Sequence, residues 1–539
     1  MMARAGQACA VVALFVALTV LMTWPQTQHL GTHVADAEDP LLSIWRISWI
    51  AHALPRHPLD LFNGNIFYPE KRTLAFTDSV LIQGLAGAPL LWMGVPAVAV
   101  YNLLLLGSIA LSGAAMWLYA FQVTGSPYAA VLAGIVFAFV PFRFDHLQHL
   151  ELQATVFLPL TLWWLERAVD SGRPRDIYGM AGALAAQVYC GIYFAIFLVS
   201  ALVIVVPLRL AALAPDRRRT LVGALARALP IAGLIVAPYL AVYVMNRDAL
   251  GDRVATDVLR YSATPGNYLA TPEGNLMYGR WSGALGQNER RLFPGMLAVA
   301  LAAVGLAARD RRRAPLAIVG LTGLIVSLGI HTPVYDVLRT AVFTYRGLRA
   351  PARAAILVYL ALAALVAVGW ARLQPKLGRW TLAATVAVGS LMLLEYITVA
   401  DSWLILPRQS PSVYRWLARQ PRSVIVELPL PTADRLDLIY EGFYMLWSTE
   451  HWDPMLNGYS GFFPRSFLEL TEVAKTFPDD RTVSYLKSRQ VDIVILHGGY
   501  MKPERFAEVT AALVSRPDMT MLAQFNEPRG QDIVFRLRR

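Results

Sequence analysis

Charged residues and cysteines are scarce in this chain of 539 residues. Asp, Glu, Lys and Arg make up 16% of it, whereas soluble globular proteins carry about 25%. The two cysteines, Cys9 and Cys190, lie in apolar runs, which argues against a disulfide framework or a cysteine-based metal site. Walker loops, nucleophile elbows, kinase signatures and HExxH sequences are also missing. Their absence argues against a nucleotide-driven pump or an enzyme with a soluble nucleotide donor.

Apolar residues are abundant instead, at 56% of the chain with a mean hydropathy of +0.46. A bilayer core about 30 Å thick requires roughly 20 apolar helical residues. The sequence therefore predicts a polytopic α-helical membrane protein with about eleven spans, of which 177–190 is short enough to be half of a broken helix. The predicted spans are 8–24, 97–121, 126–142, 152–169, 177–190, 191–212, 228–245, 292–308, 315–330, 354–373 and 380–400.

The distribution of Lys and Arg predicts the orientation of these spans, because short cytoplasmic loops are enriched in both. Alternate connecting segments carry 14 basic and 4 acidic residues, so we expect them, and the N-terminus, in the cytoplasm. The basic residues are Arg4, Arg173, Arg175, Arg217, Arg218, Arg219, Arg227, Arg309, Arg311, Arg312, Arg313, Arg372, Lys376 and Arg379. The outer segments are then 25–96, 143–151, 246–291, 331–353 and the tail from 401. Abundant Arg and Ala with few Lys favour a GC-rich bacterial genome, so the expected location is a bacterial plasma membrane.

Two segments near the N-terminus affect the predicted number of spans. Residues 79–95 contain three glycines and Pro89, and Pro96 follows directly. We interpret them as an interfacial or re-entrant helix that does not span. The first span, 8–24, could instead be a cleaved signal peptide. No small-residue cleavage site follows it closely, so an uncleaved span is favoured.

The tail 401–539 lacks long apolar runs and holds 17 basic and 17 acidic residues, so the net charge of +11 belongs to the membrane domain 1–400. The pattern predicts a small extracytoplasmic α/β domain, with helices at 412–419, 480–489 and 503–515 and strands at 423–428, 491–496, 519–523 and 533–537. The aromatic stretch 451–463 either lines a cleft or packs the tail onto the membrane. Its candidate substrate-lining residues are His451, Asn457 and Tyr459.

Three carboxylates follow the first span in the first outer segment: Asp36, Glu38 and Asp39. Mutual repulsion and partial burial raise the pKa of a carboxyl group, which suits a general base. Such a group also suits a divalent ion that neutralises a phosphate leaving group. A solvated acidic loop or a helix cap explains the same pattern without any chemistry.

The second outer segment gathers Asp145, His146, His149 and Glu151 into seven residues. On a helix, His149 would share a face with Asp145 and with His146. Imidazole together with carboxylate suits zinc or manganese, and carboxylates alone suit magnesium or manganese. Interfacial hydrogen bonding is the alternative.

The outer segment before the tenth span carries Arg346, Arg349 and Arg353, against the positive-inside bias. Arginine binds phosphate with two parallel hydrogen bonds, so these residues are candidates for a lipid-phosphate site. Anchoring to anionic lipid headgroups is the alternative. The segment 246–291 adds further arginines among Tyr and Trp, which suits carbohydrate stacking.

This layout resembles the GT-C superfamily of polytopic membrane glycosyltransferases, which includes protein mannosyltransferase-like, aminoarabinose transferase-like and YfhO-like proteins. The resemblance covers most of the chain. It is carried by the acidic motif at 36–40, by His57-Pro58 and Phe67-Tyr68-Pro69 in the first outer segment, by the His/acid and arginine segments, and by an outer C-terminal domain.

The resemblance implies an inverting transfer from a sugar donor carried on a polyprenyl phosphate. Asp39 matches the catalytic acid of the first loop, with Asp36 or Glu38 as substitutes. His149-Leu150-Glu151 looks like the metal motif of oligosaccharyltransferase-type members, with Asp145 as a further ligand, although many relatives need no metal. The magnesium or manganese ion is therefore an open expectation.

The arginine segment would hold the lipid phosphate, and His57 and His146 would line the substrate. The tail shows no counterpart of the oligosaccharyltransferase acceptor motif. The acceptor is therefore expected to be a glycan, lipid or protein of the cell envelope, and nucleic acid is not a partner.

Two other classes remain open. A transporter or lipid flippase would place functional polar residues near the bilayer midplane and have repeat-related halves. The ionisable residues of this chain cluster instead in the outer segments, and Glu395 in the last span is an unexplained exception. A noncatalytic scaffold whose tail binds an envelope partner would not need the acidic and His-rich segments to converge.

Overall fold

The chain divides into two compact units in the computed structural model. The structure describes residues 2–247, 251–308, 310–399, 403–431 and 438–538. Unit 1 comprises Met1–Leu30, Asn102–Leu240 and Asp252–Ser402, and unit 2 comprises Gly31–Tyr101, Ala241–Gly251 and Trp403–Arg539. Arg309 and the expected domain boundary at 400/401 lie outside the described residues.

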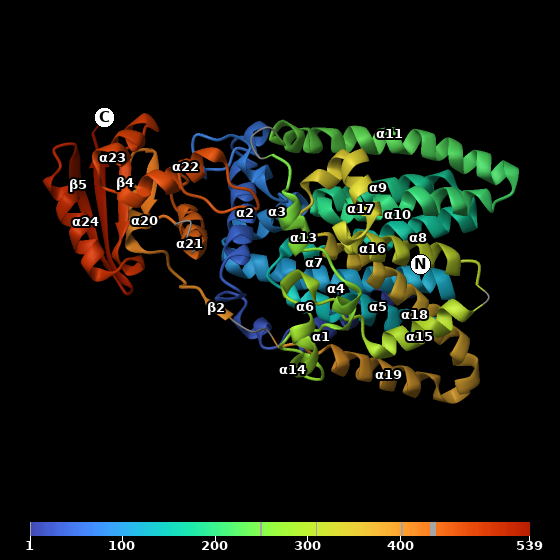
Figure 1. The fold of residues 1–539 in the computed structure, drawn as a ribbon. Helices are drawn as coiled ribbons and strands as arrows, with labels where there is room; N and C mark the ends of the chain where they lie inside the picture. The colour runs from blue at the N-terminus through green and yellow to red at the C-terminus, as the bar shows by residue number, and fades with distance from the viewer. Residues whose placement is uncertain (1, 248–250, 309, 400–402, 432–437, 539) are drawn as a thin grey trace. The chain divides into compact units, whose positions relative to one another are not determined.

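Each of the eleven predicted spans coincides with a helix. The long helices of unit 1 lie roughly along one common axis (Figure 1). The predicted segment 177–190 is the end of a 17-residue helix that a single residue, Gly191, separates from the next. The helices are α1 (Met2–Met22), α4 (Ala97–Thr124), α5 (Pro127–Phe139), α8 (Phe157–Ser171), α9 (Pro174–Cys190), α10 (Ile192–Ala211), α11 (Pro215–Met245), α15 (Met296–Ala307), α16 (Arg313–Ser327), α18 (Ala355–Leu377) and α19 (Thr381–Tyr396).

The apolar surface of these helices identifies lipid as their solvent. Among the described residues, five helical segments are long and apolar enough to cross a membrane: 97–124, 127–145, 192–211, 215–245 and 351–396. Large apolar side chains on them face outward, with Leu234 75% and Val203 67% exposed. A contiguous apolar surface of this kind would aggregate in water. The chain is therefore a multi-pass membrane protein.

Helix α18 forms the centre of unit 1, where it packs against α5, α15 and α16. Its residues are almost all buried from Ala355 to Trp370. Gly369 of α18 and Gly305 of α15 let these two backbones touch, because a Cβ on either one would lie 2.1 Å from a carbonyl oxygen of the partner helix. Small residues at such crossings are typical of helix packing in membranes.

Unit 2 joins the first outer segment to the tail. Helix α2 (Asp39–Ala53) packs against α3 (Leu81–Trp92) and against α21 (Leu438–Ser448) of the tail. Strand β1 (His33–Ala35) pairs antiparallel with β2 (Trp403–Ile405). Helix α3 has twelve residues, the same number as α15, and the expectation that 79–95 does not cross the membrane stays a prediction.

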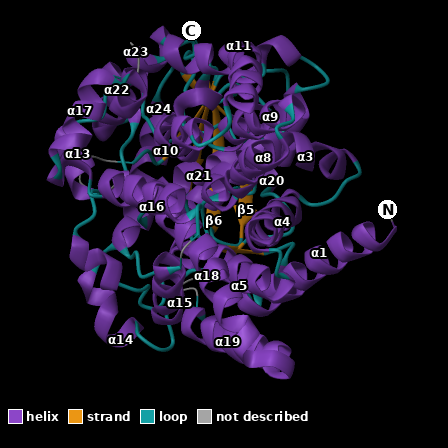
Figure 2. Cartoon of the chain, turned by 90° about the vertical axis from the view of Figure 1, so that its right-hand side faces the viewer, coloured by secondary structure: helices purple, strands orange, loops and turns teal. Residues whose placement is uncertain are grey.

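The tail contains a four-stranded sheet, the largest β structure of a chain that is otherwise mostly helical (Figure 2). Its order is β3–β4–β6–β5, with β3 and β4 parallel and the other pairs antiparallel. The strands are β3 (Ile425–Leu428), β4 (Ile493–His497), β5 (Met519–Glu527) and β6 (Gly530–Leu537). Every residue of β3 and β4 is buried, as expected for parallel strands covered on both faces.

The helices of the tail are α20 (Ser412–Leu417), α21, α22 (Arg465–Val473), α23 (Asp480–Ser488) and α24 (Pro503–Ser515). The structure therefore confirms the four strands and three helices predicted for the tail. Helices α21 and α22 were not predicted from the sequence. Leu42, Trp45 and Ile50 of α2 belong to the same hydrophobic core as the tail sheet, so the first outer segment folds with the tail.

Candidate functional site

The segment 143–151 of unit 1, predicted from the sequence to be the second outer segment, is held in place by a buried arginine. After α5 the chain forms α6 (Pro141–Asp145) and α7 (Leu150–Gln153). Arg143 is 1% exposed, and it donates hydrogen bonds to the carbonyl of Phe137 at 2.7 Å and to Oγ1 of Thr155 at 2.5 Å. Because these acceptors lie before and after the segment, Arg143 fixes the loop that carries the predicted His and acidic residues.

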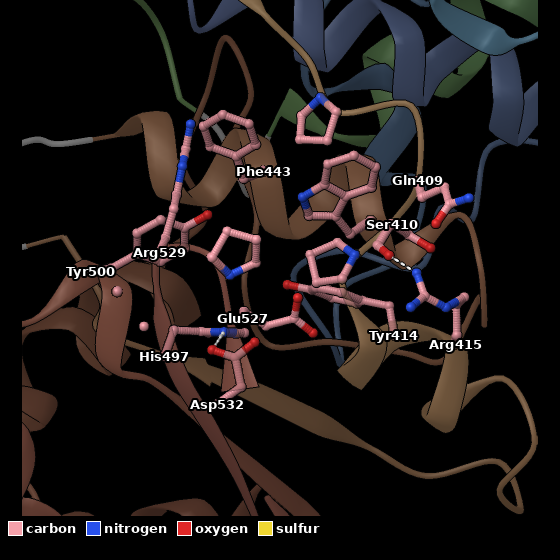
Figure 3. Close-up of a pocket in the computed structure, with 16 residues that line it drawn as sticks. Gln409, Ser410, Tyr414, Arg415, Phe443, His497, Tyr500, Glu527, Arg529 and Asp532 are labelled. Carbon is pink, nitrogen blue, oxygen red and sulfur yellow. Dashed lines mark hydrogen bonds and ion pairs between the residues drawn. The ribbon is translucent and has the colours of Figure 1, made fainter. Parts of the chain in front are cut away.

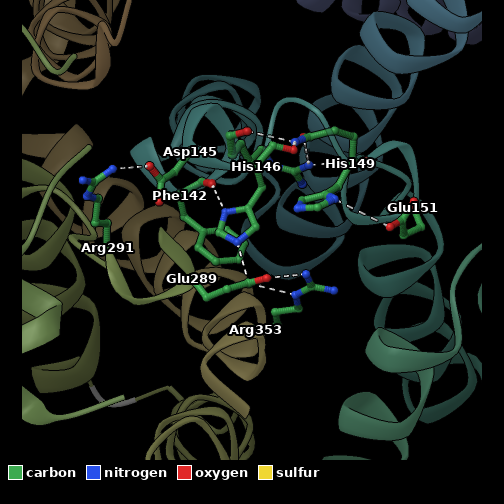
Figure 4. Close-up of polar contacts among 10 residues, drawn as sticks. Phe142, Asp145, His146, His149, Glu151, Glu289, Arg291 and Arg353 are labelled. Atoms are coloured by element: carbon green, nitrogen blue, oxygen red, sulfur yellow. Dashed lines mark hydrogen bonds and ion pairs between the residues drawn. The ribbon is translucent and has the colours of Figure 1, made fainter. Parts of the chain in front are cut away.

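His146 lies in a buried network with Glu289 and Arg353 (Figure 4). Its Nε2 lies 2.8 Å from Oε2 of Glu289, and its Nδ1 lies 2.9 Å from the carbonyl oxygen of Phe142. Arg353 donates to both carboxylate oxygens of Glu289, through Nε at 2.8 Å and through Nη2. Three segments distant in the sequence thus meet at one carboxylate.

The carboxylate of Glu289 is ionised in this network. Burial by itself raises the pKa of a carboxyl group, but the charge of Arg353 and the contact with His146 outweigh burial and hold the pKa of Glu289 well below its ordinary value. Glu289 therefore fixes Arg353 and His146 in position and balances the charge of the arginine.

Asp145 is bound to a different arginine. Arg291 donates to Oδ1 of Asp145 at 3.1 Å and to Oε1 of Glu273 at 2.5 Å. Asp145 is thus part of an ion pair and does not share a cluster with His149 and Glu151 (Figure 4).

His149 and Glu151 lie together, with Nδ1 of His149 3.9 Å from Oε1 of Glu151. Both side chains are nearly buried, at 12% and 11% exposure. Within the described part of the chain, no group of three or more His, Cys, Asp or Glu side chains has the arrangement of a metal site. The pair therefore supplies two donors of a kind that divalent metals use.

The three predicted arginines have different surroundings. Arg346 donates to the carbonyls of Arg339 and Thr340, so its guanidinium closes the last turn of α17 (Pro333–Ala341). Arg349 and Arg353 instead both contact Tyr193, at the start of α10. Arg349 does so through its backbone only, because its guanidinium lies 5.1 Å from the centre of the Tyr261 ring. The backbone N–H of Arg349 donates to the Tyr193 hydroxyl at 2.7 Å, and the Arg353 guanidinium lies 5.3 Å from the Tyr193 ring.

Arg253, which the sequence analysis did not assign to the phosphate site, joins this group. Burial, with the neighbouring charge of Arg349, lowers the pKa of Arg253 to about 10, although Tyr193 opposes the shift. Its backbone N–H bonds to the carbonyl of Arg346. We call Arg253, Arg349, Arg353 and Tyr193 the arginine cluster.

The acidic motif of the first outer segment belongs to unit 2. Asp36 is exposed and accepts a bond from the N–H of Ala37, and Glu38 is the residue before α2. Asp39 is the first residue of α2, and its Oδ1 accepts a hydrogen bond of 2.9 Å from the hydroxyl of Tyr459. Two residues that the sequence analysis selected separately, 420 positions apart, are therefore in contact.

The remaining predicted residues of unit 2 do not join this pair. His57 is exposed, before the short helix Pro58–Asp60. Asn457 is fully buried, where it hydrogen-bonds the backbone of Glu427 and the carboxyl of Glu441. The side chain of His451 is 1% exposed, and its ring stacks on Tyr414.

Glu289, Tyr193 and Arg253 were not selected from the sequence as site residues. Glu289 stands in a polar run that the sequence does not distinguish from an ordinary loop, and Tyr193 begins an apolar helix. The sequence contains one indication of an anion site, the several arginines in the predicted outer segments. It did not distinguish Arg253 from the other arginines in 246–291.

Comparisons with known proteins gave matches among solved structures only. No protein-family model matches the chain, and no curated protein matches it. An oligosaccharyltransferase of Archaeoglobus fulgidus in the apo form is 12% identical, with 90% of this chain and 69% of that chain covered and a TM-score of 0.47. A structure of the same enzyme with zinc and sulfate is 13% identical over 96% and 72%, with a TM-score of 0.46.

ArnT from Cupriavidus metallidurans, bound to undecaprenyl phosphate, is 13% identical, with 97% of both chains covered and a TM-score of 0.47. Oligosaccharyltransferase and ArnT are both GT-C glycosyltransferases.

Proposed function

We propose that this protein is a membrane glycosyltransferase that moves a sugar from a polyprenyl-phosphate donor to a cell-envelope acceptor, at the outer face of a bacterial plasma membrane. The observation that carries the proposal is the arginine cluster. The charges of Arg253, Arg349 and Arg353 act on one another there, and a lipid phosphate is an anion that reaches such a place from the bilayer.

The charges in the cluster support phosphate as the anion. Arg353 is already balanced by Glu289. Arg253 and Arg349 repel each other, and burial disfavours the charge of Arg253. A phosphate between them would relieve both effects, because guanidinium and phosphate form strong, paired hydrogen bonds. The hydroxyl of Tyr193 accepts a hydrogen bond from the backbone N–H of Arg349. This bond fixes the backbone position from which the Arg349 side chain would reach the phosphate.

The proposed reaction is a direct displacement with inversion. Asp39 takes the proton of an acceptor hydroxyl, whose oxygen attacks the anomeric carbon of the donor. The bond between that carbon and the phosphate oxygen breaks, and the polyprenyl phosphate leaves with the electron pair. The Tyr459 hydroxyl positions the base through its bond to Asp39. The arginine cluster stabilises the departing phosphate.

A divalent ion is a further part of the proposal. His149 and Glu151 would hold magnesium or manganese, whose charge would neutralise the leaving phosphate. Magnesium commonly binds through one or two carboxylates together with substrate phosphates, so a pair of protein donors suits an ion that arrives with the donor lipid.

The surroundings of Glu395 remove the feature that most favoured a transporter. Its carboxylate accepts hydrogen bonds from the N–H groups of Met296 at 2.6 Å and Leu297 at 3.4 Å, and from the hydroxyl of Tyr278 at 3.1 Å. It therefore caps the first turn of α15, where a negative charge is stabilised by the helix dipole. This acid has a structural role.

The test is transfer of radiolabelled sugar from a panel of polyprenyl-phosphate sugars to a cell-envelope extract by the purified full-length protein. Asp39→Asn should abolish label transfer. Arg349→Ala should raise the concentration of undecaprenyl phosphate needed for half-inhibition by about tenfold or more. The matched control is Arg219→Ala, an exposed arginine of a predicted cytoplasmic loop, which should leave both unchanged.

Each other outcome decides against a part of the proposal. Equal label with wild type and Asp39→Asn removes Asp39 from the mechanism. Unchanged inhibition in Arg349→Ala removes the arginine cluster as the phosphate site. Transfer that survives a chelator removes the metal, and no label with any donor contradicts the proposed activity.

A further inference from the structure

The tail holds a cavity that the proposed transfer reaction does not use. It encloses about 290 Å³ and lies wholly in unit 2, at the ends of β4, β5 and β6 (Figure 3). This volume is at the small end of the range for ligand pockets, roughly 300–1,000 Å³. The lining side chains include His497, Glu527, Arg529, Asp532, Phe443 and Trp447.

The floor of the cavity is a buried charged network. Nε2 of His497 lies 2.9 Å from Oε2 of Glu427, and its Nδ1 lies 2.9 Å from Oδ1 of Asp532. Both ring nitrogens face carboxylates, so both carry protons. The hydroxyl of Tyr414 donates to the same Glu427 oxygen at 2.5 Å, and within the described chain the second oxygen, Oε1, has no hydrogen-bond partner.

The charges around the cavity balance. Glu427 does not line the cavity but contacts His497, and with it the carboxylates of Glu427, Asp532 and Glu527 equal in number the cations of His497, Arg529 and Arg415. Glu527 accepts a bond from the N–H of Ser412, and Arg415 donates to Oγ of Ser412 at 3.0 Å. A ligand with a full charge of either sign would disturb this balance, whereas a neutral ligand with many donors and acceptors would not.

The walls are aromatic. Phe443, Trp447, Tyr414 and Tyr500 line the cavity, and Arg529 lies with its guanidinium carbon 5.4 Å from the Phe443 ring. The turn between β5 and β6 approaches the backbone after β4 so closely that a Cβ on Gly530 would lie 2.5 Å from the N atom of Gly499. This contact fixes the turn that carries Arg529, which lines the cavity.

We propose that this cavity binds a single sugar ring of a cell-envelope glycan. A sugar ring is uncharged, has apolar C–H faces that pack on aromatic rings, and has hydroxyl edges that donate to carboxylates and accept from guanidinium groups. The cavity offers these three features together, at a size that admits one ring. The site contains none of the residues assigned to sugar transfer, and only the assignment of the ring to a cell-envelope glycan rests on the proposed function.

The test uses the purified full-length protein in detergent and the methyl glycosides of glucose, galactose, mannose and N-acetylglucosamine. Binding is measured by saturation-transfer NMR and by titration calorimetry. At least one glycoside should bind with a millimolar or lower Kd, and Glu527→Gln and Arg529→Ala should each weaken it about tenfold. Arg536→Ala, an exposed arginine of β6 outside the cavity, is the matched control and should bind as wild type does.

Thermal unfolding of each variant shows whether the tail is still folded. If Arg529→Ala destabilises the domain, Glu527→Gln decides alone. Absence of binding for all four glycosides at millimolar concentration would overturn the proposal. Binding that both cavity variants leave unchanged, or that Arg536→Ala weakens equally, would also overturn it.

Discussion

Glu289 shows how much one side chain can organise in a membrane protein. It is 7% exposed, and it holds His146 of the second outer segment and Arg353 at the start of the α18 segment. A buried ion pair contributes little net stability, but removing one partner leaves an uncompensated charge. The ordered geometry of the arginine cluster therefore depends on a residue that does not belong to it.

We predict that Glu289→Ala destabilises the protein by about 3–5 kcal/mol, because it leaves the buried cation of Arg353 without its carboxylate. Thermal unfolding in detergent measures the change. The control is Glu273→Ala, which removes an ion-paired carboxylate whose side chain is 65% exposed and should cost at most about 1 kcal/mol. Equal destabilisation by the two variants would contradict this role for Glu289.

At the scale of elements, the contact between α15 and α18 sets the core of unit 1. Lipid tails are as apolar as leucine, so the hydrophobic effect drives helices together only weakly in a membrane. Close backbone packing takes its place, and here Gly305 and Gly369 make that approach possible. Helix α18 also packs against α5 and α16, so a change at its contact with α15 also affects the packing of those two helices.

We expect Gly369→Ala to lower the thermal stability, because its Cβ would lie 2.1 Å from the carbonyl oxygen of Leu301. Overpacking of this kind costs about 1–3 kcal/mol. Gly107→Ala in α4 is the matched control. A Cβ there has nothing within 4 Å, and replacing a helical glycine with alanine stabilises by roughly 0.5–1 kcal/mol. A Gly369→Ala protein as stable as the control would show that the helices can separate without cost.

At the scale of the whole molecule, titratable groups buried in unit 2 link its stability to pH. Burial alone lowers the pKa of His497, but hydrogen bonds and charges from Asp532 and Glu427 outweigh it and raise the pKa to about 9 from 6.5. Burial raises the pKa of Glu441 from 4.5 to about 8, against hydrogen bonds from Asn457 and Gly458. Both groups therefore bind protons more tightly in the folded state.

The sign follows from linkage: stability falls with rising pH wherever the folded state holds more protons. The contribution of His497 is complete below pH 6.5 and is lost as pH approaches 9. That of Glu441 is lost between pH 4.5 and 8. We predict that unit 2 unfolds at a steadily lower temperature from pH 6.5 to 9, measured by tryptophan fluorescence.

Glu441→Gln should flatten this slope, because its amide does not titrate. Glu469→Gln in α22, where the carboxylate side chain is 57% exposed, should keep the slope of the wild type. A slope that Glu441→Gln leaves unchanged would mean that Glu441 does not hold its proton in the folded protein.

The positions of the apolar helices and of the tail strands could be predicted from the sequence, because both follow from local patterns. Every predicted span is helical, and β4 lies within one or two residues of the strand expected at 491–496. Helix α21 was missed because its apolar and aromatic residues, Leu438–Ser448, show no start or stop signal in the sequence. The assignment of 31–101 to the unit of the tail also had no local signal.

The sequence by itself determined that this chain lies in a membrane, where its helices and strands are, and which loops hold acids, histidines and arginines, because hydropathy and periodicity are properties of neighbouring residues. Tertiary structure alone decided the partners. Glu289 with Arg353, Tyr193 with Arg349, Tyr459 with Asp39, and His497 with Glu427 and Asp532 each join residues that are distant in the sequence. The physical reason is that a buried charge or hydroxyl must find a partner, and the packed fold determines which group is within reach.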